Sequence, residues 1–370
     1  MQRQNNASGL NASAQPTSGG NNNNAEVDEL FEVKTYFYIG AYQQCLNEIN
    51  KLRVSQSWNR KKNGKEKNET NIEFKLQAND LKKDCFMWRA YIAQHKYRVV
   101  LDGIPATDSV ELGFRGIRKV AEYFSANSSD GRNAVVKFFD DNLSTLASSS
   151  ADDEDVIHSN IVFRLAAATV YYNESLYENA LRSVHGALAL NASHLECLAM
   201  QLQCLLKMNR LDLAKKTLAS MQGNDDDATL TQLATAWINI ELGGEKLQDA
   251  YYIFQDFCDK FVTTSLLLNG QAVCFIAQEK YEEADAALRN SLDKDPNNLD
   301  TLINLIALAQ HYSAGQTAGA KSSEEVVNRY LSQIRDAHPT CQLVLDLERK
   351  EQEFDRLCLK YEPSVKTLAI

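Results

Sequence analysis

The stretch "LQDAYYIFQDFCDK", residues 247–260, shares its pattern with "YEEADAALRNSLDKDP", which begins at Tyr281. The small residues Ala250 and Ala284 lie 34 positions apart. In both stretches a large residue stands three positions before the alanine, and another stands four positions after it. Such spacing places all three residues on one face of a helix. The aromatic residues of the first stretch therefore indicate a packing face of one helix in a series, rather than a substrate pocket.

The same pattern occurs twice more upstream. Ala180 lies between Tyr177 and Val184, and Ala214 follows Ala180 by 34 positions and precedes Ala250 by 36. A period near 34 with this order of large and small residues is the tetratricopeptide signature, in which each repeat is a pair of antiparallel helices. The small residue marks the closest crossing of the pair, because a larger side chain would overpack there.

Weaker copies extend the array in both directions. Their small positions are Cys45, Val100, Val135 and Val327, which makes about eight helical pairs. The run "LVLDLERKEQEFDRLCLKY" from Leu343 predicts a last helix that caps the end of the stack. With only five prolines and 16 glycines, the chain has few turn signals for a sheet. The predicted fold is all-α, a tetratricopeptide-like α-solenoid of helical hairpins with a C-terminal capping helix.

Breaks in the period predict the domain organisation. Residues 1–25 form an Asn-rich tail without core-forming residues, and 364–370 form a second tail. Residues 26–150 are expected to hold N-terminal helical repeats, and residues 151–363 the C-terminal tetratricopeptide-like repeats and the capping helix. A basic insert at about 55–79 is expected to be disordered, and a long loop is expected at 311–323. The insert suits either a tolerated surface insertion, which we favour, or a contact with phosphate or an acidic partner.

Composition excludes several functional classes. The net charge is −10 and the pI about 5.2, so no general nucleic-acid binding or direct adsorption to an anionic membrane is expected. The first 24 residues lack the apolar core of a secretory signal. No run approaches the roughly 20 apolar residues that cross a bilayer. The eight cysteines form no CxxC pair, which is typical of reduced thiols in a cytosolic protein.

No catalytic or cofactor motif emerges. "GGEK" at 243–246 lacks the spacing of a phosphate-binding loop. His194, Cys197 and Cys204 can share a helix face, but buried packing cysteines explain them better than a metal site does. The sequence therefore predicts a protein without enzymatic activity, cofactor or metal.

A helical solenoid binds other proteins along its concave face, which the first helix of each pair lines. On those helices the sequence shows no lysine clamp of the kind that tetratricopeptide co-chaperones use for acidic chain ends. The expected surface is mixed apolar and amide, and it suits a folded or extended protein segment. The candidate partner-binding residues are Asn239, Leu242, Leu266, Asn269, Val273 and Ile276.

Several strings together resemble one family. They include "VDELFEVKTYFYIGAYQQCLNEI" at 27–49, "DATLTQLATAWINIELGGEKLQDAYYIFQDF" at 227–257 and "LLLNGQAVCFIAQEKYEEA" at 266–284. With "RLDLAKKTLASMQ", "TLINLIALAQH", "NRYLSQIRDAH" and "EFDRLCLKYEP", they resemble the epsilon subunit of coatomer over about residues 27–363. The Asn-rich tail, the basic insert and the loop at 312–323 depart from the family.

The resemblance implies a structural subunit of the vesicle coat that acts in Golgi-to-ER and intra-Golgi transport. It also implies binding and stabilisation of the C-terminal domain of the alpha subunit, contacts with other coatomer subunits, and only indirect membrane contact. The expected location is cytoplasmic, on the cytosolic face of Golgi membranes and coated vesicles. The alternative is a tetratricopeptide co-chaperone or adaptor that reads short peptide motifs; the missing lysine clamp disfavours it.

Overall fold

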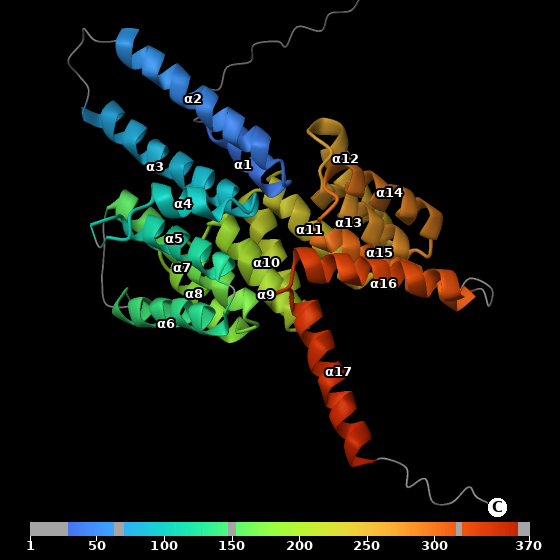
Figure 1. Ribbon diagram of the computed structural model, residues 1–370. Helices are drawn as coiled ribbons and strands as arrows, with labels where there is room; N and C mark the ends of the chain where they lie inside the picture. Colours follow the sequence, from blue (N-terminus) through green and yellow to red (C-terminus); the bar gives the residue numbers. More distant parts are fainter. Residues whose placement is uncertain are drawn as a thin grey trace, which may run out of the picture.

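The computed structural model describes residues 29–62, 70–107, 109–126, 128–146, 153–315 and 320–361. Every regular element within these ranges is a helix, and they follow one another as antiparallel pairs around a curved array (Figure 1). The first eight are α1 Phe31–Tyr38, α2 Tyr42–Lys62, α3 Thr70–Ala93, α4 Tyr97–Gly103, α5 Leu112–Ser125, α6 Ser129–Leu146, α7 Glu154–Asn173 and α8 Tyr177–Leu188. The others are α9 Leu195–Lys207, α10 Leu211–Asn224, α11 Thr229–Leu242, α12 Lys246–Lys260, α13 Ser265–Ala277, α14 Tyr281–Lys294, α15 Leu299–Gly315, α16 Ala320–Ala337 and α17 Gln342–Lys360.

The predicted small positions lie where paired helices cross. The side chains of Ala180, Ala214, Ala250 and Ala284 are all completely buried. Each belongs to the second helix of its pair, α8, α10, α12 or α14. The predicted all-α solenoid and its register are therefore confirmed.

A second feature repeats with the same period. The turns inside six pairs contain a residue with positive φ: Gly40, His95, Ser175, Asn209, Gly243 with Gly244, and Glu279. In five of the six turns, the next amide donates back across the turn to a carbonyl five residues earlier; for example, Arg210 N donates to Leu205 O at 2.8 Å. This hydrogen bond satisfies a carbonyl that the end of the helix would otherwise leave unpaired.

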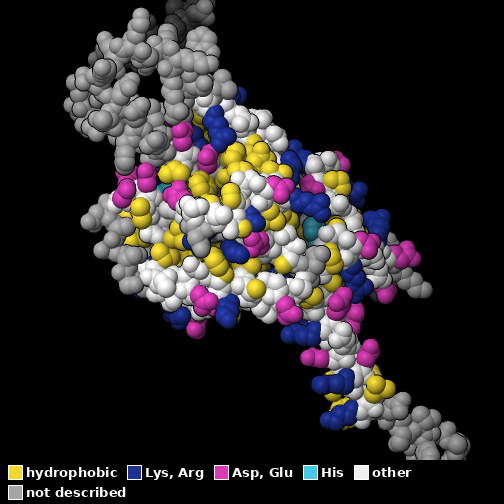
Figure 2. Space-filling view, turned by 60° about the vertical axis from the view of Figure 1, so that its left-hand side comes forward, with side chains coloured by type: hydrophobic (Ala, Val, Ile, Leu, Met, Phe, Trp, Pro, Cys, Tyr) yellow, Lys and Arg dark blue, Asp and Glu magenta, His cyan; other side chains and the backbone are white. Residues whose placement is uncertain are grey.

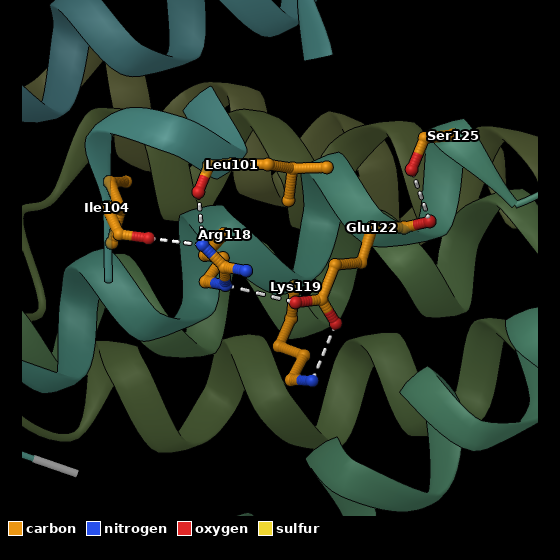
Figure 3. A network of polar contacts seen from close by, with 6 residues as sticks. All are labelled: Leu101, Ile104, Arg118, Lys119, Glu122 and Ser125. Atoms are coloured by element: carbon orange, nitrogen blue, oxygen red, sulfur yellow. Dashed lines mark hydrogen bonds and ion pairs between the residues drawn. The ribbon is translucent and has the colours of Figure 1, made fainter. Parts of the chain in front are cut away.

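The corner between α4 and α5 is fixed by one side chain. Arg118 of α5 donates to the carbonyl oxygens of Leu101, at 2.5 Å, and of Ile104, both at the end of α4 (Figure 3). Its Nε also donates to Glu122 at 3.1 Å, and Lys119 donates to the same carboxylate at 2.6 Å. The guanidinium thereby closes the C-terminal end of a helix only seven residues long, where a cation is favoured.

The N-terminal pair packs against repeats that lie about 200 residues later in the chain. Ile39 and Ala41, in the turn between α1 and α2, share a hydrophobic core with Leu233, Phe254 and Leu267 of α11 to α13. Thr264 Oγ1 donates to the carbonyl of Ile39 at 2.6 Å, and the hydroxyls of Thr35 and Thr229 are 3.2 Å apart. The start of the array therefore packs against repeats of its later half.

The ends of the array also approach each other. The rings of His95, after α3, and His338, after α16, have centroids 6.4 Å apart. Together with the α1 contacts, this proximity shows that the solenoid curves far enough for its second pair, α3–α4, to meet the end of its last pair, α15–α16.

Two expected loops are shorter than predicted. The α2 helix continues to Lys62 and α3 begins at Thr70, so helices occupy much of the insert expected at 55–79. The α15 helix likewise reaches Gly315, and α16 begins at Ala320. Neither 55–62 nor 70–79 contains Pro or Gly, and Gln, Lys, Arg and Glu favour helix, so a helix continues there. Residues 63–69, 316–319 and both tails lie outside the described residues.

The boundary expected at residue 150 separates repeats that share one core. Val120, Tyr123 and Phe139 from before it pack in one cluster with Phe163 and Tyr171 from after it. The rings of Phe139 and Phe163 have centroids 5.2 Å apart. The two halves are therefore one continuous array, because the stacking that joins neighbouring repeats continues across position 150.

The terminal helix is present, but it covers the stack only with its first turn. Val344 is buried against Leu302, Ile306 and Ile334, whereas residues 348–361 are exposed. Figure 1 shows α17 extending away from the body. The expected capping role is thus limited to the first turn, because the apolar residues further along do not face α15 and α16.

Candidate partner-binding channel

Two cavities lie side by side on the inner side of the array. The first has a volume of about 340 Å³ and a mainly apolar lining from α3, α5 and α7, which includes Ile92, Ile117, Val120 and Leu165. The second has a volume of about 410 Å³, is more polar and is lined from α1, α3, α7, α9 and α11. Arg89 and Val162 line both cavities. We call the two together the channel.

A charged junction stands where the cavities meet. Arg89 Nη1 donates to both carboxylate oxygens of Glu196, at 3.1 and 3.0 Å, and Tyr38 Oη donates to the same carboxylate at 2.5 Å. The guanidinium also lies over the rings of Phe37 and Phe86, at 4.8 and 5.3 Å from their centroids. The junction thus links α1, α3 and α9, which are far apart in the sequence.

Electrostatics at the junction keep Glu196 ionised. Burial by itself would raise the pKa of this carboxyl, but the Arg89 charge, the His194 side chain and the hydrogen bonds from Tyr38 and Arg89 together outweigh burial, and the net shift of the pKa is downward. A half-buried charge of this kind is stable only while its partner remains, so the pair fixes the relative position of the three helices.

Two histidines on the wall of the second cavity have unused hydrogen-bonding atoms. His158 Nε2 and His194 Nδ1 are both buried and make no hydrogen bond to the described residues. Burial, together with the charge of Lys82, lowers the pKa of His158 to about 4. Burial also lowers the pKa of His194. Two neutral imidazoles therefore offer a donor or an acceptor to whatever enters the cavity.

The six predicted partner-binding residues do not form one open surface. The amide of Asn269 is buried, donates to Thr301 Oγ1 at 2.9 Å and accepts from Asn304 Nδ2 at 3.1 Å. Ile276 packs in the core between α13 and α14. Asn269 thereby joins two adjacent repeats, whereas Ile276 is half-buried within its own pair, and the assignment of both to a partner-binding surface stays a prediction.

The other four predicted residues remain partly accessible. Asn239 and Val273 are half-buried, and Leu242 is exposed. Leu266 is exposed but lies against the α1–α2 turn, since a Cβ added at Gly40 would meet the Leu266 Cβ at 3.3 Å. The chain's own N-terminal pair thus covers part of the concave face that the repeat pattern left open.

Sequence reasoning missed the channel residues because it looked for the groove only in the later repeats. The available signal was Arg89, a charge within the apolar run "CFMWRAYIA" at 85–93. A charge on an apolar helix face requires a partner. Glu196, however, could not be paired with it from sequence spacing.

The cysteines behave as packing residues. Cys197 and Cys204 are fully buried, and burial raises the pKa of Cys204 to about 11 and that of Cys197 further still. Over the described part of the chain, no three His, Cys, Asp or Glu side chains are placed to hold a metal ion. Over the same ranges, none of the helices combines the length and the apolar character needed to span a membrane.

A comparison with known families matches the profile described as "Coatomer epsilon subunit" over residues 26–65 and 64–362. The chain belongs to the coatomer epsilon subunit family. Among curated members of this family, the Arabidopsis thaliana coatomer subunit epsilon-1 is 33% identical over 332 residues, which cover 90% of this chain and 97% of the relative. The Dictyostelium discoideum coatomer subunit epsilon is 34% identical over 315 residues, 84% of this chain and 91% of the relative.

Solved structures place the epsilon-family fold among the tetratricopeptide proteins. A tetratricopeptide repeat protein from Parabacteroides merdae aligns with a TM-score of 0.50 at 12% identity, over 75% of this chain and 96% of the other. The Cut9–Hcn1 assembly aligns with a TM-score of 0.51 at 11% identity, over 89% of this chain and 56% of the other. At these identities the likeness concerns the fold alone. The predicted resemblance to the coatomer epsilon family is confirmed by the family profile and the curated relatives.

Proposed function

We propose that this chain is the structural coatomer subunit that binds and stabilises the C-terminal domain of the alpha subunit, in Golgi-to-ER and intra-Golgi transport. In this proposal the channel encloses a segment of the alpha subunit. The chain contributes no catalysis and no cofactor, and it reaches the cytosolic face of Golgi membranes only through other coat subunits. Family membership supports the coat assignment, and the channel supports the mode of binding.

The observation that carries the proposal is the pairing of an apolar cavity with a polar one across Arg89. Cavities of this size suit side chains of an extended segment rather than a folded domain. Apolar side chains of such a segment would enter the first cavity. Its backbone polar groups would meet the unpaired nitrogens of His158 and His194 in the second. Leu242, at the end of α11, is a further candidate contact because its side chain is exposed.

A cavity-filling variant tests this mode of binding. Ala93 lines the apolar cavity and is half-buried, so Ala93→Trp fills the cavity without replacing a fully buried residue. Because central apolar contacts dominate interfaces, we expect the affinity for the full-length alpha subunit to fall by about tenfold or more. Titration calorimetry measures the affinity, and circular dichroism verifies the fold.

The matched control is Ala189→Trp, since Ala189 is exposed after α8 and does not line either cavity. The control should bind like the unaltered chain. Unchanged affinity of a folded Ala93→Trp variant would refute the channel as the binding site. If even the unaltered chain ignores the alpha subunit and instead captures chaperone peptides, the coat function itself is refuted.

A further inference from the structure

The α17 helix leaves the body as a fixed arm. Its first turn is anchored by buried Val344, and Arg335 of α16 donates to Glu351, at the middle of α17, at 3.3 Å. Beyond these contacts every described residue is exposed, as the projecting helix in Figures 1 and 2 shows. The arm therefore has a defined direction, although most of its surface touches nothing in this chain.

One face of the arm is apolar. Leu347, Phe354, Leu357, Cys358 and Tyr361 follow each other at i, i+7, i+10, i+11 and i+14, which is one side of a helix. Phe354 is 66% exposed, Leu357 46% and Tyr361 68%. We call these five residues the arm stripe. A single helix of this length is marginal in water by itself, so a partner that covers the stripe would also stabilise the helix.

Both borders of the arm stripe are acidic. Glu348, Glu351 and Asp355 follow one border at i, i+3 and i+7, and Arg335 already pairs the middle one. Glu353 stands on the other border, and Lys350 lies within the stripe, between Leu357 and Tyr361 around the helix. The basic residues Arg349, Arg356 and Lys360 lie on the side away from the stripe. The surface that docks is thus apolar, with one lysine inside it and carboxylates along both edges.

This charge distribution argues against a second copy of the chain. In an antiparallel pair of arms related by a two-fold axis, the acidic borders of both helices would face each other, and like charges at such positions are unfavourable. A parallel pair would set the carboxylates of one border against Glu353 of the other helix, which is again a like-charge contact. The acidic edges also disfavour an anionic membrane surface.

We propose that the arm stripe docks in an apolar groove on another coat subunit, bordered on one side by lysine or arginine opposite Glu348 and Asp355. This inference rests on the proposed coat function. It assigns a second interface, apart from the channel, through which the last helix ties the chain into the coat. Aromatic anchors such as Phe354 and Tyr361 dominate interfaces of this type.

The test compares two variants of the full-length chain. Phe354→Asp with Leu357→Asp places charges in the stripe, whereas Leu359→Asp changes an apolar residue that is 77% exposed but lies off the stripe. Each is titrated against coatomer assembled without this subunit. We expect the double variant to bind about tenfold more weakly or worse, and the control to bind normally. Glu348→Lys with Asp355→Lys should also weaken binding.

The outcomes separate this inference from the proposed function. If the double variant binds like the parent while Ala93→Trp loses affinity, the arm inference is wrong and the channel stands. If the isolated chain sediments as a dimer that the double variant abolishes, the occupant is a second copy and the inference fails. If the parent binds vesicles of phosphatidylcholine with phosphatidylserine and the double variant does not, a membrane is the occupant. Circular dichroism verifies that each variant remains helical.

Discussion

Single side chains decide how closely this array can pack. Ala284 is completely buried where α14 crosses α13, next to Ala272 and Leu305. Gly270 plays a related part where α13 meets α12, because a Cβ added there would lie 2.7 Å from the Phe254 ring. At both positions the side chain is small because the neighbouring helix occupies the space.

Ala284→Phe tests the first of these positions. Overpacking should lower the free energy of unfolding by about 1–3 kcal/mol or more, since no void receives the ring. The exposed neighbour Glu282→Ala should change it little. Thermal melting followed by circular dichroism compares the two, and equal midpoints for Ala284→Phe and the parent would contradict the register.

His158 makes stability depend on pH. Burial lowers its pKa to about 4 in the folded state. Between about pH 6.5 and pH 4 the side chain is therefore neutral in the folded state but protonated in the unfolded state. The unfolded state binds more protons in this window. Stability from this residue is therefore full above about pH 6.5 and is lost as the pH falls toward 4.

His158→Gln should remove that dependence. Between pH 7 and pH 4.5 we expect the parent to lose on the order of 2 kcal/mol more unfolding free energy than the variant, after allowance for its partial exposure. Urea titrations at both pH values measure the difference. Parallel losses in the two proteins would show that His158 takes up its proton in the folded state.

At the scale of elements, the contacts of α1 turn an open solenoid into a closed one. Its turn meets α13 through Thr264, whose hydroxyl accepts from Leu267 N at 3.3 Å and donates to Ile39 O at 2.6 Å. One side chain thus caps α13 and ties it to the start of the chain. The α17 helix is the contrasting case, since only its first turn is packed.

Thr264→Ala should therefore lower the free energy of unfolding by more than the loss of an N-cap on an isolated helix would. Both hydrogen bonds disappear and a buried carbonyl loses its donor, at about 1–3 kcal/mol in total. Ser265→Ala, one residue on, leaves both bonds in place and serves as the control. Urea unfolding measures each variant; a Thr264→Ala protein as stable as the control would argue against the α1–α13 tie.

For the whole molecule, curvature brings the second and last helical pairs together at His95 and His338. This closure encloses the channel, and it depends on the sum of all helix crossings rather than on any single one. The Arg89–Glu196–Tyr38 junction is its internal counterpart, because it joins three helices from different parts of the chain.

Crosslinking tests the closure in solution. His95→Cys with His338→Cys, in a background with exposed Cys358 replaced by serine, should react with a short bismaleimide to give an intramolecular link. Mass spectrometry of the digest identifies the joined peptides, and the yield should not depend on protein concentration. The single-cysteine variants define the background. Absence of the 95–338 link above that background would mean an open array.

The sequence by itself determined the repeat, its register and the family. The alanines at 180, 214, 250 and 284 predict where the paired helices cross. They can do so because close packing within a pair is a local requirement of every repeat. Helix ends near 55–79 and 311–323 were less predictable, since polar residues support both a loop and a solvated helix.

Only the tertiary structure decided where the channel lies and which residues line it. The repeat pattern predicts that consecutive hairpins stack. The overall curvature, however, is the sum of small rotations between neighbouring hairpins, and the spacing of residues in the sequence does not show this sum. For that reason Asn269 matched a concave face in sequence yet bonds to the next repeat, while Arg89 and Glu196, 107 residues apart, meet where the two cavities join. Closure over long sequence distances is a property of the folded chain. It decides which part of the concave face the N-terminal pair covers and where the channel lies.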